Sequence, residues 1–312
     1  MKEKVLSVTL NPSIDKTIQV EELKPYELNR VLASRVDPGG KGINVAKALK
    51  NFGVEAVATG LIAGKNGQNM LEELQQAGIT LDFYEIEGET RTNIKIVDLD
   101  NQKTTEINEK GFLVTEKDLN GFREKYQSLL KFTDVVVLSG SLPPGIPSDF
   151  YYECISLAKL LGKKVILDAD GDALKQGLLA APFAIKPNLQ ELETILELKL
   201  NDLNAIIDAA KQFIQKGIEI VIVSIGADGA VIGNKDHFYK ADTWPVKVKG
   251  ATGSGDSMVA ALAYSILKNS SLEEIARITT AAGTITASKD GSQICDLNDV
   301  LNSLNRVELH KI

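Results

Sequence analysis

The sequence predicts an α/β fold in which a mostly parallel sheet is covered by helices on both faces. Short runs rich in β-branched residues recur along the chain, and several lack the polar alternation of a strand with one solvated face. Segments with the apolar periodicity of helices lie between these runs. Strands that alternate with helices are typical of parallel sheets, because a parallel connection needs a long crossover that a helix supplies.

The predicted elements follow in chain order. Buried strands are expected at residues 5–10, 54–62, 135–138, 165–167 and 219–225. Helices are expected between them, most clearly at residues 119–130, 150–161 and 203–213. A further helix is expected to begin at or just before Asp256, because the apolar residues from Val259 to Ile266 are spaced i, i+3, i+4 and i+7.

Two segments, residues 16–36 and about 90–110, depart from this pattern and have the alternation of amphipathic strands. Residues 92–98 alternate with a period of two, and the Asp-Leu-Asp-Asn sequence at 98–101 supplies a turn. We expect a small antiparallel sheet, a discontinuous lid on one α/β domain that spans residues 1–312. Its apolar face needs a cover, so the lid should close over a site, pair with a second copy, or do both.

Composition excludes several classes of protein. The 312 residues are 44% hydrophobic and 25% charged, as in ordinary globular proteins, and the net charge of −7 is opposite to that of a nucleic-acid binder. No stretch approaches 18 apolar residues, and the N-terminal apolar run is too short for a secretory leader, so no membrane partner is expected. The two cysteines, 141 positions apart, match no zinc or disulfide pattern. These observations favour a cytoplasmic protein.

Three short motifs resemble known sites but fail on their spacing. The segment 60–66 has three residues between its glycines where a P-loop needs four, and it is expected to be a strand-to-loop turn. The Gly-x-Gly pairs at Gly40 and Gly253 lack the third glycine of a dinucleotide fingerprint. His237 and His310 adjoin no Ser or Cys motif and are expected to be incidental.

The strongest chemical motif is Gly-Ala-Thr-Gly-Ser-Gly-Asp at residues 250–256. Gly253, Ser254 and Gly255 come just where a helix begins, so free N–H groups and the helix dipole would favour an anion such as a transferring phosphoryl group. Asp256 in the first turn could accept a proton from an attacking hydroxyl, and the dipole is expected to keep it ionised. The alternative is a glycine loop with a helix-stabilising Asp.

A second glycine-rich turn, Pro-Gly-Gly-Lys-Gly-Ile-Asn at residues 38–44, also leads into a predicted helix. Gly39 and Gly40 permit a ligand to approach the backbone closely, and Asn44 could donate and accept hydrogen bonds to hydroxyl groups. The turn therefore suits a sugar. A plain turn with a helix cap remains the alternative.

Arg91, Asn93 and Lys95 alternate on one predicted strand, so all three side chains point to the same face. Two cations and one amide on one face could bind a phosphate group. A protein of net charge −7 needs such a local positive patch for a dianionic ligand. The alternative is a solvated polar face.

Two further segments fit either a structural or a nucleotide-binding role. Asn188 and Glu191 have the spacing of a capping box, and an Asn and a Glu at a strand end could also hold water-coordinated magnesium. The Ser224 to Gly229 segment follows a buried strand and fits a hairpin turn or a glycine-lined nucleotide edge.

Together, the glycine motifs at residues 39–46 and 253–257 resemble the two signatures of the PfkB carbohydrate kinases, which have a ribokinase-like fold. Further matches extend over nearly the whole chain: Asn-Pro-Ser-Ile-Asp at 11–15, Ser-Gly-Ser-Leu-Pro at 139–143, Lys-Pro-Asn-x-x-Glu at 186–191, and Ser-Ile-Gly-Ala-x-Gly at 224–229. The opening at residues 9–15, the Gly-Gly-Lys-Gly sequence and Gly-Glu-Thr-Arg at 88–91 look like the phosphosugar branch, which holds 1-phosphofructokinases and tagatose-6-phosphate kinases. The Arg-x-Asn-x-Lys spacing, and Gly-Phe-x-Val-Thr at 111–115, look like the 1-phosphofructokinases.

The resemblance implies a role for each matched residue. Asp256 would be the catalytic base, and the backbone from Thr252 to Gly255 the anion hole. Sugar hydroxyls would be held by Asp15, Gly39, Gly40, Lys41, Asn44 and Ser139. The substrate phosphate would meet Arg91, Asn93, Lys95 and Arg30 of the lid. ATP phosphates and magnesium would lie near Lys186, Asn188 and Glu191, with Ser224, Gly226 and Gly229 along the nucleotide.

The resemblance also implies the activity. The expected reaction is ATP- and Mg²⁺-dependent phosphorylation of the sugar phosphate fructose 1-phosphate, by a homodimer joined through the lid. Tagatose 6-phosphate is the alternative substrate. A sugar-phosphate sensor without catalysis is the alternative from another class, but a sensor need not retain Asp256.

Overall fold

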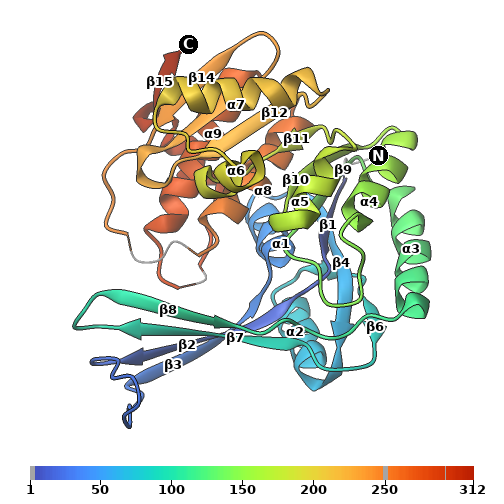
Figure 1. The fold of residues 1–312 in the computed structure, drawn as a ribbon, viewed down its shortest axis with the longest axis vertical. Coiled ribbons are helices and arrows are strands. Elements are labelled where there is room, and N and C mark those ends of the chain that lie inside the picture. The colour runs from blue at the N-terminus through green and yellow to red at the C-terminus, as the bar shows by residue number, and fades with distance from the viewer. Residues whose placement is uncertain (1–3, 249–251, 292) are drawn as a thin grey trace.

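The computed structural model describes residues 4–248, 252–291 and 293–312, and its body is a large sheet between helices (Figure 1). The long strands at its centre are β1 (Lys4–Thr9), β4 (Glu55–Ala63), β9 (Val135–Ser139), β10 (Lys164–Asp168) and β12 (Ile220–Ser224). The remaining strands are β5 (Thr80–Leu81), β6 (Tyr84–Ile86), β11 (Ala184–Ile185), β13 (Ala230–Gly233), β14 (Phe238–Asp242) and β15 (Glu308–Lys311).

The strand order of the large sheet is β15-β14-β13-β12-β11-β10-β9-β1-β4-β5, with β6 paired to β4. All neighbours from β12 to β5 are parallel, while β13, β14 and β15 extend one edge antiparallel. From β1 the chain first builds toward β4 and later, from β9 onward, in the opposite direction. The order therefore reverses between β1 and β9, and ligands of open α/β sheets bind at the carboxyl ends of strands at such a point.

Two core clusters cover the two faces of this sheet. Successive residues of one strand enter different clusters, as Val136 and Val137 of β9 do, which explains why the central strands carry no polar alternation. On one face lie α3 (Glu116–Leu130), α4 (Phe150–Leu160), α5 (Gly171–Leu178), α6 (Leu189–Leu196) and α7 (Leu203–Gln215). On the other lie α1 (Lys41–Asn51), α8 (Ser254–Leu267), α9 (Leu272–Ala287) and α10 (Leu297–Asn302).

The expected lid is a separate four-stranded sheet that projects from the body (Figure 1). This lid sheet contains β2 (Ser13–Val20), β3 (Ala33–Gly39), β7 (Arg91–Asp98) and β8 (Lys103–Asn108), in the order β3-β2-β7-β8. Each hairpin is antiparallel as expected, but the two hairpins join through a parallel pair, β2 and β7. The predicted turn at 98–101 is present, with Asp98 accepting hydrogen bonds from the backbone and side chain of Asn101.

The pairing register gives the lid sheet two unlike faces. Residues directly opposite one another share a face, so Thr17, Lys95 and Glu106 lie side by side, and Asp15, Asn93 and Asn108 lie beside them. The other face carries the apolar side chains of Ile14, Ile18, Val36, Ile94, Ile96 and Ile107.

The structure corrects the expectation for residues 60–66. Instead of a strand-to-loop turn, β4 runs directly into α2 (Gly64–Gln76). The carboxylate of Glu89 accepts hydrogen bonds from the backbone N–H groups of Lys65 (3.3 Å) and Asn66 (2.6 Å). A carboxylate thus occupies this helix N-terminus, where a P-loop would hold a phosphate. Among the described residues, no helix is both long and apolar enough to cross a membrane.

Candidate active site

Buried polar side chains gather at the carboxyl ends of the strands where the sheet order reverses. Thr9, Ser139 and Asp168 end β1, β9 and β10, and the register places them side by side. Each is at most 2% exposed, and Thr9 Oγ1, Ser139 Oγ and Asp168 Oδ2 have no hydrogen-bond partner within the described chain. A buried polar atom without a partner costs about 1–3 kcal/mol, so this edge is a place for a ligand to supply partners.

The N-terminus of α8 points at the same edge. Gly253 takes the left-handed conformation (φ 83°) at the N-cap, and no side chain caps the helix. Its first N–H groups are thus free to meet an anion, as the sequence predicts. Ser254 Oγ is buried without a partner in the described chain. Gly250 and Ala251 of the same motif lie outside the described residues.

Asp256, in the first turn of α8, is 7% exposed, and its Oδ2 accepts a hydrogen bond from Asn44 Nδ2 at 2.8 Å. Burial, together with the nearby Asp168 carboxylate, raises the pKa of Asp256 to about 6. Desolvation outweighs the favourable contacts of this carboxyl, so its pKa lies above the ordinary value for Asp even at a helix N-terminus. At neutral pH most Asp256 side chains are still ionised, with a basicity well above that of an exposed Asp.

Two lysines surround Asp168 beside this helix end. The Asp168 Oδ1 atom lies 3.4 Å from Lys186 Nζ and 3.5 Å from Lys41 Nζ, and Glu191 Oε1 lies 3.6 Å from Lys41 Nζ. Burial alone would raise the pKa of Asp168, but the two ammonium groups outweigh it and lower that pKa. Burial likewise opposes the charge of Lys41, and the Asp168 and Glu191 carboxylates raise its pKa in spite of it.

Lys186 lies directly beneath the glycine turn. It is 4% exposed, and a Cβ atom added to Gly255 would stand 3.3 Å from Lys186 Nζ. Its positive charge therefore adds to that of the α8 N-terminus. Lys41, expected near sugar hydroxyls, contacts the Asp168 and Glu191 carboxylates, and both it and Lys186 act on Asp256 by lowering its pKa.

Asp15 and the first glycine turn meet at the base of the lid sheet. Asp15 Oδ1 accepts hydrogen bonds from Ser13 Oγ (2.7 Å) and Asn93 Nδ2 (3.2 Å). A Cβ atom on Gly39 would stand 2.2 Å from Asp15 Oδ2, so only glycine lets the carboxylate lie against this backbone. Gly40 follows with φ 119° and caps α1 without a side-chain hydrogen bond.

Arg91 and Lys95 share the polar face of the lid sheet, as predicted, but they have different partners. Arg91 donates to the backbone carbonyl groups of Glu109 (2.9 Å) and Asn11 (3.0 Å), and its buried Nε atom has no partner within the described chain. Lys95 Nζ contacts Thr252 Oγ1 and lies 3.0 Å from Glu106 Oε1. Lys95 thus joins the lid sheet to the segment that precedes the α8 N-terminus.

Arg30 lies exposed in the loop between β2 and β3. Neither a hydrogen bond nor an ion pair joins it to the other predicted residues in the described part of the chain. The structure therefore does not bring Arg30 into the site.

The two segments predicted to face the nucleotide also form the structural features that were their alternatives, a helix capping box and a hairpin turn. Asn188 and Glu191 make the complete capping box of α6, at 2.7 and 2.8 Å, and Ser224 to Gly229 turn the β12–β13 hairpin, with Gly226 (φ 61°) and Gly229 (φ 82°) in left-handed backbone. A backbone bridge sets Asn188 beside Ser224. Glu191 Oε1 remains outside the capping box and faces Lys41. No cluster of three metal-ligating side chains was found among the described residues.

Sequence reasoning missed Asp168, Thr9 and Ser13. Asp168 carries a signal in retrospect, because it directly follows a buried apolar strand and parallel strands end at one edge. Its neighbours Lys41 and Lys186 are 127 and 18 positions away in the sequence, so their pairing depends on the fold.

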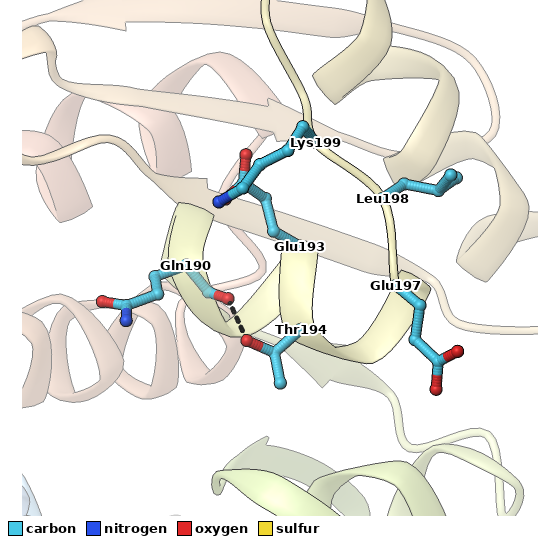
Figure 2. Close-up of a pocket in the computed structure, with 6 residues that line it drawn as sticks. All are labelled: Gln190, Glu193, Thr194, Glu197, Leu198 and Lys199. Carbon is cyan, nitrogen blue, oxygen red and sulfur yellow. Dashed lines mark hydrogen bonds and ion pairs between the residues drawn. The ribbon is translucent and has the colours of Figure 1, made fainter.

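Two hollows flank α6. One, of about 280 Å³, is lined by Asp170, Lys175, Asn188 and Glu191 among others, and so opens next to the residues above. The other, of about 320 Å³, shares Gln190 and Thr194 with the first, extends along the C-terminal end of α6 and contains none of the predicted residues (Figure 2). Its wall is closed by internal contacts, such as Thr194 Oγ1 donating to the Gln190 carbonyl at 2.8 Å. Unpartnered polar atoms, and not the size of a hollow, mark the site at Asp256.

The chain is similar in sequence and structure to known proteins. Residues 8–299 match the family described as pfkB family carbohydrate kinase. A Thermotoga maritima structure named as a possible 1-phosphofructokinase is 29% identical, with a TM-score of 0.91 over 99% of this chain and 100% of that one. Phosphofructokinase-2 from Escherichia coli is 28% identical, with a TM-score of 0.90 over 98% and 99% of the two chains. A Staphylococcus aureus protein with the provisional name phosphofructokinase is 32% identical, with a TM-score of 0.81 over 99% of both chains.

Proposed function

The chain belongs to the pfkB family of carbohydrate kinases, and we propose that it phosphorylates fructose 1-phosphate with ATP to give fructose 1,6-bisphosphate. The observation that carries this proposal is the buried Asp256 carboxylate in the first turn of an uncapped helix with two lysines nearby. A base and an anion site within one helical turn are the parts that phosphoryl transfer requires.

In the proposed reaction, Asp256 accepts the proton of the sugar 6-hydroxyl while the hydroxyl oxygen attacks the γ-phosphorus of ATP. The bond from that phosphorus to the β,γ-bridging oxygen breaks, and ADP leaves. The N–H groups of residues 253–255 would bind the transferring phosphoryl oxygens, aligned before the reaction by the helix that holds them. Asn44 holds Asp256 in place through its 2.8 Å hydrogen bond.

Lys41 and Lys186 would stabilise the negative charge that spreads over the phosphoryl group. Both ammonium groups are held by Asp168, whose burial keeps the group rigid. Bound Mg²⁺ would neutralise nucleotide phosphate charge, and the residues fit such an ion, because Glu191 Oε1 is outside the capping box and Asp168 Oδ2 lacks a partner. We propose Glu191 and Asn188 as its water-mediated contacts, with Ser224, Gly226 and Gly229 along the nucleotide.

The sugar phosphate would lie between the body and the polar face of the lid sheet. Asp15, with the backbone at Gly39 and Gly40, would bind sugar hydroxyls, and Thr9 and Ser139 offer further unpartnered hydroxyl groups. Lys95 and the free Nε atom of Arg91 are the cationic groups for the substrate phosphate. Both substrate ends would then be fixed with the 6-hydroxyl toward Asp256.

Neighbouring structures support a phosphofructokinase but differ in the sugar they name. The Thermotoga maritima protein is named as a possible 1-phosphofructokinase, whereas the Escherichia coli enzyme has been solved with fructose 6-phosphate. The Arg-x-Asn-x-Lys strand favours fructose 1-phosphate. Tagatose 6-phosphate is the second candidate, because its phosphate and attacking hydroxyl also lie at opposite ends of the furanose.

An assay of ADP release with the three sugar phosphates at equal concentration tests the proposal. We expect the highest kcat/KM for fructose 1-phosphate, and a kcat about a thousandfold lower for the Asp256→Asn variant. A higher kcat/KM for either of the other two sugar phosphates would change the proposed substrate but leave the assignment as a kinase intact. Binding of a sugar phosphate without ADP release would instead support the sensor.

We also propose that the apolar face of the lid sheet pairs with a second copy of the chain. Val36 and Ile107 on this face are 52% and 54% exposed, and Ile14 alone of its six apolar side chains packs on a core cluster of the described body. A neighbouring phosphofructokinase-2 is described as tetrameric in an inhibited form, which shows that relatives associate.

A further inference from the structure

Lys47, in the second turn of α1, lies behind the glycine turn, and no hydrogen bond or ion pair joins it to a predicted ligand-binding side chain among the described residues. Its Nζ atom donates a hydrogen bond to the backbone carbonyl of Pro38 at 2.6 Å. Pro38 is the second-last residue of β3, so this bond joins a helix of the body to the strand at the base of the lid sheet.

The Pro38 peptide controls the backbone that contacts Asp15. In the β2–β3 register, Pro38 lies opposite Ile14, between the Asp15–Asp37 and Ser13–Gly39 pairs. The Asp15 carboxylate rests against Gly39 with no room for a Cβ atom. A small movement of residues 38–40 would therefore displace the carboxylate, or leave a gap beside it.

A partly buried ammonium group at this position has a cost that packing alone does not explain. Burial lowers the pKa of Lys47, while the Asp37, Glu73, Asp15 and Asp256 carboxylates oppose that effect. An apolar side chain such as methionine would fill the same volume without desolvating a charge. The positive charge of Lys47 thus strengthens its hydrogen bond to the Pro38 carbonyl and attracts the carboxylates around the glycine turn.

The same face of α1 also serves the catalytic residues. Lys41, Asn44 and Lys47 are spaced three apart and so lie along one side of the helix. Lys41 contacts Asp168, Asn44 contacts Asp256, and Lys47 contacts Pro38. One rigid helix therefore fixes the distance between the base and the lid.

We propose that Lys47 is a positioning residue that holds residues 38–40 against Asp15 and thereby sets the affinity for the sugar phosphate. The inference rests on the proposed function, because it assigns Asp15 and the glycine turn to the sugar. It adds a residue that the family signature and the sequence motifs do not place in the site.

The test compares Lys47→Met and Lys47→Arg with Lys50→Met as the matched control. Lys50 also lies on α1 and donates to a backbone carbonyl, that of Ala77, but it is exposed and remote from Asp15. Lys47→Met should raise KM for the sugar phosphate about tenfold or more, because a hydrogen bond from a charged group is lost. KM for ATP should change by less than about twofold, Lys47→Arg should restore most of the sugar affinity, and Lys50→Met should match the wild type.

Hydrogen exchange of residues 33–40 in the free protein gives a second measurement that needs no substrate. Lys47→Met should speed exchange in this segment, and Lys50→Met should not. If Lys47→Met does not fold, Lys47→Gln, which keeps a donor without the charge, takes its place. The proposal is overturned by unchanged exchange at 33–40, by an unchanged sugar KM, or by equal losses for sugar and ATP. If the wild type phosphorylates no sugar phosphate, the proposed function fails and the exchange result still decides the role of Lys47.

Discussion

At the scale of single residues, burial of Asp256 should set the pH dependence of the proposed reaction. Its pKa of about 6 means that the carboxyl holds a proton below that pH and cannot accept one from the sugar hydroxyl. We expect kcat to be level above pH 7 and to fall about tenfold per pH unit well below pH 6. A pH–rate profile at saturating substrates measures this, and a profile still level at pH 5 would contradict the assignment of Asp256 as the base.

The same burial makes Asp256 costly for stability. Its pKa is higher in the folded than in the unfolded chain, so it stabilises the fold fully at pH values below its unfolded pKa, and this stability is lost as the pH rises through about 6. At pH 8, Asp256→Asn should therefore unfold with a free energy about 1–3 kcal/mol higher than the wild type, while kcat falls about a thousandfold. Urea unfolding at pH 8 and pH 5 measures the difference in unfolding free energy between the variant and the wild type, which should be smaller at pH 5. A variant that is less stable than the wild type at both pH values would refute it.

Lys95 gives a prediction for the substrate phosphate. If its ammonium group binds that phosphate, Lys95→Met should raise KM for fructose 1-phosphate about tenfold to a hundredfold, with a smaller effect on ATP. Lys16→Met is the matched control, because the register places Lys16 on the opposite face of the lid sheet, beside Ile94. Steady-state kinetics of the two variants should differ in the sugar KM alone. Equal effects would show that only the net charge of the lid sheet matters.

The residues of the site could be predicted from the sequence only where a local motif carries them. Spacing within one helical turn predicted Asp256 and its glycines, and also the pair Asn188 and Glu191. Asp168 carries no such motif, and the pairing of Lys41 with it needs two strands and a helix to be placed in space. The raised pKa of Asp256 could not be predicted either. The sequence indicates that the residue lies at a helix N-terminus, but it does not show how deeply the carboxyl is buried.

At the scale of elements, periodicity predicted the central strands and the long helices to within a few residues. Strand β9 and helix α4 each differ from the expected range by a single residue at one end. The antiparallel edge from β13 to β15 was not predicted, because its strands are short and the last lies at the far end of the chain. Local patterns do not predict the parallel pairing of β2 with β7 either, because the paired residues, such as Ser13 and Arg91, are 78 positions apart in the sequence.

The lid sheet gives a prediction at this scale. The polar face of β2 and β7 carries charged and amide groups that a bound sugar phosphate would bridge to the body, so substrate should restrain both strands. Hydrogen exchange at residues 13–39 and 91–108 should slow when fructose 1-phosphate saturates the enzyme. Helix α3, whose side-chain hydrogen bonds outside the helix and its N-cap reach only Asp82, Glu153 and Cys154 in the described chain, serves as the internal control and should not change. Unchanged exchange in both lid segments would argue against a lid.

At the scale of the whole molecule, the distribution of charge bears on how an acidic protein would bind the proposed anionic substrate. The net charge of −7 repels a sugar phosphate at long range, but the ammonium groups of Lys41, Lys95 and Lys186 lie near the α8 N-terminus. Each of the three is paired with a carboxylate, that of Asp168, Glu191 or Glu106. Their fields act over the Debye length of about 8–10 Å, within which the ligand is bound. The local patch therefore decides binding, while the net charge influences mainly the rate of encounter.

The apolar face of the lid sheet gives the last prediction, the oligomeric state. A four-stranded sheet that turns isoleucines and a valine to solvent is costly alone, and a second lid sheet of the same shape would cover it about a two-fold axis. We expect the wild type to be a dimer by analytical ultracentrifugation and Ile107→Asp to be a monomer, because a carboxylate at the centre of an apolar contact costs several kcal/mol unless it is paired. Leu160→Asp is the control, since Leu160 is 84% exposed on the body and remote from the lid sheet. A monomeric wild type would show that the face is covered in another way, and a dimer that survives Ile107→Asp but not Leu160→Asp would move the interface to the body.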